Sequence, residues 1–320
     1  MDKKKRYLRD EALYNRIQEN EIPLFFACLP GSVEAVLDRE TLWQGVGRPP
    51  VPLYDVLVCL LVKEYFHLSL RRNIGLLQLL KRARYIDAEI HCFKTLDNYL
   101  NNGSIQIYLH KLIELTSAVF SQVERCMATD STGTSTTCYS SWYSIRVCKK
   151  SKRKDHLMVH ISVGTRSNVV VAIDVRTTKG DDNVIFRSHV KRVNRTFDVD
   201  EWSGDSAYLS RENCNAVHAI GAEPWFKLKT NTTAKAKGSP TWKKMVTISK
   251  ENPEIANPKY HKRSNVESTN SAKKRKFNNF VRGKLSTSKK NEEHLSWIGY
   301  NFSLIPRAYY EFGIKPSFGG

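Results

Sequence analysis

The chain has 320 residues, with 51 Lys and Arg against 32 Asp and Glu, a formal net charge of +19 at pH 7. Its 41% hydrophobic content is that of a globular protein and excludes collagen-like, mucin-like and wholly disordered chains. No apolar run reaches the ~20 residues that cross a bilayer, and the seven cysteines contain no CxxC pair. We therefore expect a cytoplasmic protein, without a disulfide framework or membrane span, that binds a polyanion.

The first 120 residues are predicted to be helical. Ser69, Thr95 and Ser104 are each expected to cap a helix. Apolar residues recur at i, i+3 and i+4 in three segments, as in amphipathic helices: residues 53–67, 70–85 and 105–123.

Basic residues lie on or beside these helices and favour two interpretations. The region could be a helix-turn-helix-like DNA reader, or it could be a packing or dimerisation unit. The residues concerned are Arg71, Arg72, Lys81, Arg82 and Arg84.

From Cys126 onward the pattern becomes that of a mixed α/β domain. A basic linker through Pro258 and a helix over about 260–281 are expected to follow the strands. Strands alternating with helices indicate one mixed sheet covered by helices. The predicted strands are residues 126–130, 156–163, 169–177, 201–208 and 225–230, and the predicted helices between them are residues 181–197 and 210–220.

Three acids are placed where a sheet could bring them together. Asp130 ends the first predicted strand, Asp205 lies at the fourth, and Glu267 lies on the late helix. Carboxylates without a His or Cys cluster suit Mg²⁺ or Mn²⁺, and two such ions ~3.5–4 Å apart support phosphoryl displacement. A single acid such as Asp130 could equally be a turn or cap residue. Four other acids have a similar local appearance: Asp174, Asp181, Asp200 and Glu201.

The late helix carries a mixed polar stripe. Tyr260, Arg263, Glu267 and Lys274 follow one another at spacings of 3, 4 and 7 residues, which places them on one face of a continuous helix. Such a face could bind metal and phosphate together. The alternative is an exposed Arg–Glu pair of little energetic value.

Most of the excess charge lies in one segment. Residues 225–290 contain 18 Lys and Arg and 3 Asp and Glu, interleaved with aromatic residues. This pattern favours nucleic-acid binding, although a solvated surface would look similar. Within the segment, the run Lys273, Lys274, Arg275 and Lys276 is interpreted as a DNA contact.

The sequence resembles DDE transposases of bacterial and archaeal insertion sequences that carry the signature Y-(2)-R-(3)-E-(6)-K. Tyr260, Arg263, Glu267 and Lys274 match all four positions at the family spacing. The resemblance extends through ATDSTG, TTKGDDNVIF and GDSAYLSRENCNAVHAIGAEPWFKLKTN, over about residues 125–280. The helical region resembles the N-terminal part of the same proteins less specifically.

This resemblance implies an RNase H-like catalytic domain over residues 121–320, preceded by an all-α DNA-binding or dimerisation domain over residues 1–120. Asp130, Asp205 and Glu267 would be the catalytic triad and hold two Mg²⁺ or Mn²⁺ ions. The signature's Tyr, Arg and Lys would contact DNA phosphates.

The same resemblance implies the reaction. Such enzymes bind terminal inverted repeats of double-stranded DNA as oligomers, nick to leave a 3′-hydroxyl, and use it to attack target DNA. Some relatives pass through a DNA hairpin and carry a β-rich insertion between the second Asp and the Glu. Only 61 residues separate Asp205 from Glu267, which does not favour that route. Trp225 or Trp242 could stack on a flipped base, although a tryptophan beside a strand is more often in the core.

Two other functions share these features. A decayed or repurposed transposase would keep the basic surface and act as a DNA-binding protein. An RNase H-like or Holliday-junction nuclease would share the fold and the metals, but would not transfer strands. In all three cases we expect a protein of the prokaryotic cytoplasm that is associated with the nucleoid.

Overall fold

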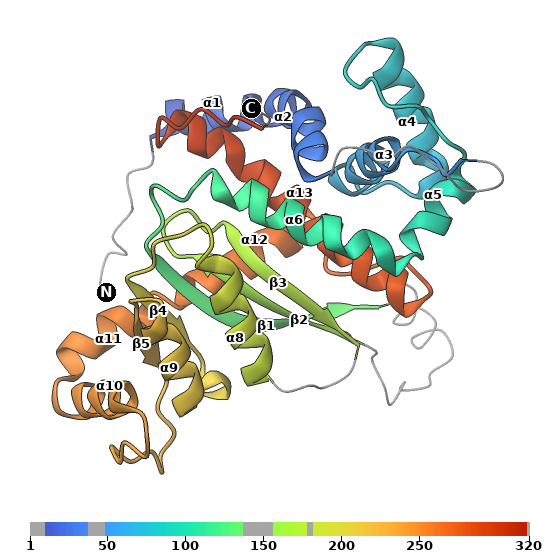
Figure 1. Cartoon of the computed structure of the whole chain (residues 1–320). Coiled ribbons are helices and arrows are strands. Elements are labelled where there is room, and N and C mark those ends of the chain that lie inside the picture. Colours follow the sequence, from blue (N-terminus) through green and yellow to red (C-terminus); the bar gives the residue numbers. More distant parts are fainter. Residues whose placement is uncertain (1–9, 38–48, 137–155, 178–181, 319–320) are drawn as a thin grey trace, which may run out of the picture.

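The computed structural model describes residues 10–37, 49–136, 156–177 and 182–318. One five-stranded mixed sheet forms its centre, in the order β3-β2-β1-β4-β5 (Figure 1). β1 pairs antiparallel with β2 and parallel with β4; β3 pairs antiparallel with β2, and β5 parallel with β4. The strands are β1 (Cys126–Ser135), β2 (His156–Gly164), β3 (Val170–Arg176), β4 (Glu201–Gly204) and β5 (Glu223–Phe226).

Three strands differ from the prediction. β4 ends at Gly204, and residues 206–208, which were predicted to belong to it, form a 3-10 turn. β1 continues to Ser135, because its pairing with β2 extends that far although its pairing with β4 ends at Thr129. Asp130 therefore lies within the strand and not at its end. β5 ends at Phe226, and residues 227–230 do not continue it.

Both faces of the sheet are covered. The side chains of Ala128, Val159 and Ile161 join a buried cluster with five helices: α2 (Glu21–Val36), α3 (Leu53–Tyr65), α6 (Gln106–Ala118), α12 (Ser264–Lys276) and α13 (Ser286–Tyr310). Met127 and Trp202 belong to a second cluster, with α8 (Asp182–Val193), α9 (Arg211–Ala219) and α10 (Pro240–Glu251). Alternation along the strands separates the two sets.

The described part of the first 120 residues consists of helices joined by short loops, and the helical character agrees with the prediction. Ser69 caps α4, and its hydroxyl accepts a hydrogen bond from the Arg72 N–H. Thr95 and Ser104 do not act as caps: α5 begins at Phe93, and Asn102 caps a short 3-10 turn before α6. The helices are α1 (Glu11–Glu19), α2 (Glu21–Val36), α3 (Leu53–Tyr65), α4 (Leu70–Arg82), α5 (Phe93–Leu100) and α6 (Gln106–Ala118).

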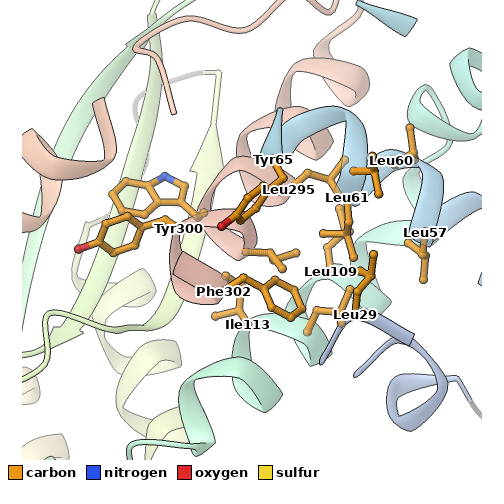
Figure 2. Close-up of a cluster of buried hydrophobic side chains, with 14 of the residues drawn as sticks. Leu29, Leu57, Leu60, Leu61, Tyr65, Leu109, Ile113, Leu295, Tyr300 and Phe302 are labelled. Atoms are coloured by element: carbon orange, nitrogen blue, oxygen red, sulfur yellow. The ribbon is translucent and has the colours of Figure 1, made fainter. Parts of the chain in front are cut away.

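The longest described helix, α13 (Ser286–Tyr310), lies near the end of the chain and packs against the N-terminal helices α1, α2, α3 and α6. Figure 2 shows Leu295, Tyr300 and Phe302 of α13 packed with residues of α2, α3 and α6 in one apolar cluster. The domain division at residue 120 remains a prediction, and the hydrophobic core crosses it. None of the described helices is long and apolar enough to span a membrane.

The expected linker before Pro258 is wrong, because two helices fill it. Ser239 caps α10 and Pro240 starts it, while Trp242, Met245 and Val246 form its buried side. α11 (Pro253–His261) follows, and α12 (Ser264–Lys276) is shorter than the predicted helix over 260–281. The many lysines of this segment are compatible with amphipathic helices because they occupy the exposed faces.

Candidate active site

The strand register places Asp130 beside Asp205. β1 and β4 run parallel and pair Thr129 with Gly204, and the next residue of each chain segment is an aspartate. A Cβ on Gly204 would lie 2.9 Å from the Phe226 ring, so a glycine is needed where β4 ends against β5. The register therefore places the two aspartates next to each other at the carboxyl end of β4.

Each aspartate has its own support. The Asp205 carboxylate accepts a 2.6 Å hydrogen bond from the Ser206 N–H and thereby caps a 3-10 turn, Ser206–Tyr208. The Asp130 side chain is 15% exposed. Burial raises the pKa of Asp130, the Arg263 guanidinium opposes this shift, and the neighbouring negative charge of Asp205 adds to it.

Arg263 lies at the centre of the acidic groups. Its Nη2 is 3.2 Å from Asp130 Oδ2, and its Nη1 is 3.0 Å from Glu267 Oε1. Burial acts to lower the pKa of Arg263, but Asp130, Tyr260, Asp205 and Glu267 together raise it. The guanidinium therefore contacts Asp130 and Glu267 directly, and it also interacts electrostatically with Asp205 and Tyr260.

The four signature residues come from two helices and the turn between them. Tyr260 lies on α11, Arg263 lies in a turn with i to i+3 hydrogen bonds, and Glu267 and Lys274 lie on α12. The expected single helix is wrong at residues 262 and 263. Both residues nevertheless keep right-handed helical backbone angles, so the chain direction is largely maintained and the residues still gather.

α12 is tied to β1 along its length, and runs behind the sheet in the view of Figure 1. Asp130, Thr132 and Thr134 alternate along β1 and so share one face of the sheet. Arg263 binds the first of them, and Lys274 Nζ donates to Thr132 Oγ1 at 2.7 Å. The third, Thr134, donates to Glu293 of α13 at 3.0 Å.

Lys273 was predicted to contact DNA, and its ion pair with Glu293 shows that this prediction is wrong. Lys273 is 2% exposed, and its ammonium lies 2.9 Å from Glu293 Oε1 and above the Trp297 ring. A cation enclosed in this way cannot reach a phosphate. Glu293 is not among the residues predicted from the sequence; the signal for it was a pair of adjacent acids within the stretch NEEHLSWIGY.

The other members of the basic run are more accessible. Arg275 is exposed on α12. Lys276 is 37% exposed at its side chain and forms an ion pair with Glu21 of α2. Lys274 is half-buried, and burial lowers its pKa.

Oxygen ligands dominate the site. Within the described ranges, no three His, Cys, Asp or Glu side chains are arranged closely enough to hold a metal ion. Glu267 is 62% exposed and is held by Arg263 rather than by the aspartates. The donor chemistry of Asp130, Asp205 and Glu267, which is carboxylate only, fits Mg²⁺ or Mn²⁺.

The other acids noted in the sequence have separate partners. Asp174 binds His189 and Arg192; burial acts to raise its pKa, and these two partners reverse the shift and lower it. Asp200 pairs with Arg125, and Glu201 with two lysines of α11 and the turn after it. Asp181 lies outside the described residues.

Trp225 and Trp242 are buried, at 4% and 6% exposure. This agrees with the interpretation that they belong to the core. Trp242 donates to the Thr233 carbonyl, and Lys259 lies above the Trp225 ring.

A mixed sheet in this order, with helices on both faces and two aspartates on adjacent central strands, is consistent with an RNase H-like catalytic domain. The model of the family described as "Transposase DDE domain" matches residues 121–304, more than half of the chain. The protein therefore belongs to the DDE transposase family. No curated protein and no solved structure was found to match it.

Proposed function

We propose that the protein is the transposase of an insertion sequence. It binds the element's terminal inverted repeats as an oligomer at the nucleoid of a prokaryotic cell, cuts a strand, and joins the 3′-hydroxyl end to target DNA. One observation carries this proposal most strongly: the strand register places Asp130 next to Asp205 within the matched segment, and Arg263 links Asp130 to Glu267.

Asp130, Asp205 and Glu267 would hold divalent cations, either two Mg²⁺ or two Mn²⁺ ions. Bound there, the metal would activate a water or hydroxyl nucleophile and stabilise the leaving oxygen. The residues themselves supply the negative charge, and β1 and β4 supply a rigid base for the two aspartates.

Arg263 and its neighbours would position the DNA. A guanidinium released from Asp130 and Glu267 can bind a phosphate with two hydrogen bonds. Tyr260, on α11, lies close enough to Arg263 to affect its pKa, and would contact the same strand. Lys274, Arg275 and Lys276 extend the positive charge along α12.

The salt dependence of DNA binding tests this cationic surface. Replacing Lys274, Arg275 and Lys276 with Ala should flatten the slope of log K against log salt by up to about three units, because each phosphate contact contributes about 0.9. The matched control is Lys191→Ala with Arg195→Ala, since both side chains are exposed at or just after α8, on the opposite side of the sheet. An unchanged slope in the triple variant would make the run a solvated surface.

Strand transfer tests the function itself. The purified protein is incubated in Mg²⁺ with duplexes that carry the DNA flanking the gene, and with a plasmid target. We expect nicks at inverted repeats that leave 3′-hydroxyl ends, joined end–plasmid products, and no reaction in EDTA.

Two results would contradict the proposal, and each favours one alternative. Cutting of scrambled duplex at the same rate without joined products would indicate an RNase H-like nuclease. Binding to the ends without any cutting in Mg²⁺ or Mn²⁺ would indicate a decayed transposase that acts as a DNA-binding protein.

A further inference from the structure

One face of helix α4 is basic, and no other part of the described chain covers it. Asn73, Leu77 and Leu80 form the buried side of the helix. The opposite side is exposed along its whole length, and Leu79 on it is 64% exposed. Its exposed residues are Arg71, Arg72, Gly75, Gln78, Leu79 and Arg82.

The spacing makes this face a continuous stripe. Steps of three and four residues lead from Arg71 and Arg72 through Gly75 to Gln78 and then Arg82, and such steps keep residues on one side of a helix. The thirteen residues of α4 span about 20 Å. Arg84 adds to the charge, whereas Lys81 forms an ion pair with Glu89 at 2.6 Å. No acidic residue occurs between Ser69 and Tyr85.

Gly75 stands in the middle of the stripe. A Cβ built there would meet no atom within 4 Å, so the fold itself does not require a glycine. Glycine inside a helix lowers its stability relative to alanine. Gly75 therefore weakens the helix without improving its packing. A binding partner that must come close to the α4 backbone would explain why a glycine stands there.

The helix is held firmly enough to present this face. The Ser69 hydroxyl caps its first turn, and Asn73 donates a 3.0 Å hydrogen bond to the Cys59 carbonyl of α3. The Arg71 guanidinium stacks on the Phe93 ring of α5 at 3.9 Å. In Figure 1, α4 stands out from the helices beside it.

We propose that α4 is the helix that reads DNA, with the stripe Arg71, Arg72, Gln78 and Arg82 inserted into the major groove and Gly75 at the point of closest approach. The inference rests on the proposed function, which supplies DNA as the partner. The major groove admits an α-helix, and arginine and glutamine are the side chains that bind guanine and adenine edges with paired hydrogen bonds.

Charge complementarity favours a duplex over a second copy of the chain. Arg72, Arg82 and Arg84 form no side-chain hydrogen bond or ion pair with the other described residues, and two such faces would repel each other. The face also differs in role from α12, because α12 supplies phosphate contacts near the acids, whereas α4 supplies recognition of sequence.

The test uses the full-length protein with substitutions at Gly75, Gln78 and Arg82, and competition binding between terminal-repeat and scrambled duplexes. Gly75→Leu should leave the melting temperature unchanged or raise it, and should weaken terminal-repeat binding at least tenfold. Gly75→Ala is the milder variant if leucine perturbs folding.

Arg82→Ala and Gln78→Ala should each reduce the preference for terminal repeats by about five- to 150-fold. Arg195→Ala, an exposed arginine just after α8, is the matched control and should change neither quantity.

The outcomes separate the two proposals. If the wild-type protein prefers and cuts terminal repeats and the α4 variants keep that preference, α4 is not the reader and the proposed function stands. If the variants instead lose self-association with unchanged DNA preference, the face is a dimer contact and the inference is overturned. A wild-type protein with no preference for the ends overturns both.

Discussion

Asp130→Asn and Asp205→Asn should each reduce the rate of strand cleavage by more than ~100-fold. Loss of a residue that only hydrogen-bonds a metal ligand costs ~10–100-fold, and loss of a ligand itself should cost more. Glu267→Gln should have the same effect. Each substitution keeps the volume of the side chain and removes the negative charge that a divalent cation needs. DNA affinity should change little, because no phosphate-binding cation is lost. Single-turnover nicking in Mg²⁺ and a binding assay on the same duplex measure the two effects.

Glu254→Gln is the matched control for these variants. Glu254 is an exposed acid in the first turn of α11, close in sequence to the signature but without a described ion pair. It should retain the wild-type nicking rate. Asp174→Asn is less suitable, because Asp174 holds His189 and Arg192 and its loss should cost stability. A triad variant that nicks at the wild-type rate would show that its carboxylate is not a metal ligand.

Glu293→Ala should lower the free energy of unfolding by about 3–5 kcal/mol, the usual cost of breaking a buried ion pair by removing one partner. Lys273, Thr134 and Trp297 all donate to the same oxygen of Glu293, at 2.9, 3.0 and 2.8 Å. Removing the carboxylate leaves a buried ammonium and two buried donors unpaired. For a protein of 320 residues the melting temperature should fall by about 4–7 °C.

A double variant separates the charge effect from simple loss of packing. Lys273→Met combined with Glu293→Leu should recover part of the lost stability, because it removes the unpaired ammonium and fills the space with apolar residues of similar volume. The remaining loss comes from Thr134 and Trp297, which still lack their acceptor. Lys94→Ala, which breaks an exposed pair with Asp97 on α5, should change stability by well under about 1 kcal/mol. A melting temperature of Glu293→Ala close to that of the wild type would contradict the buried-pair assignment.

Local patterns in the sequence determined much of the fold. Apolar periodicity predicted α3, α4 and α6. Two runs rich in β-forming residues, separated by turn residues, predicted β2 and β3. The Ser69 cap was predicted from its hydroxyl alone, whereas Thr95 and Ser104 failed as caps because neighbouring residues began the helices earlier. The lysine-rich segment before Pro258 was predicted to be a linker, but it contains α10 and the start of α11. Its charge indicated exposure to solvent, which does not distinguish a linker from an exposed helix.

The sequence by itself also predicted that Asp130 and Asp205 would lie near each other, and the register of β1 and β4 places them so. Only the tertiary structure decided which side chains contact the acids and which cations are buried. Arg263 joins Asp130 across 133 positions of sequence, a contact that depends on α12 packing along β1. The run at 273–276 looks uniform as a sequence, yet Lys273 is buried and Arg275 exposed. The reason is that α12 turns one side toward Glu293 of α13, and no local pattern specifies which side of a basic helix meets a buried acid twenty residues further on.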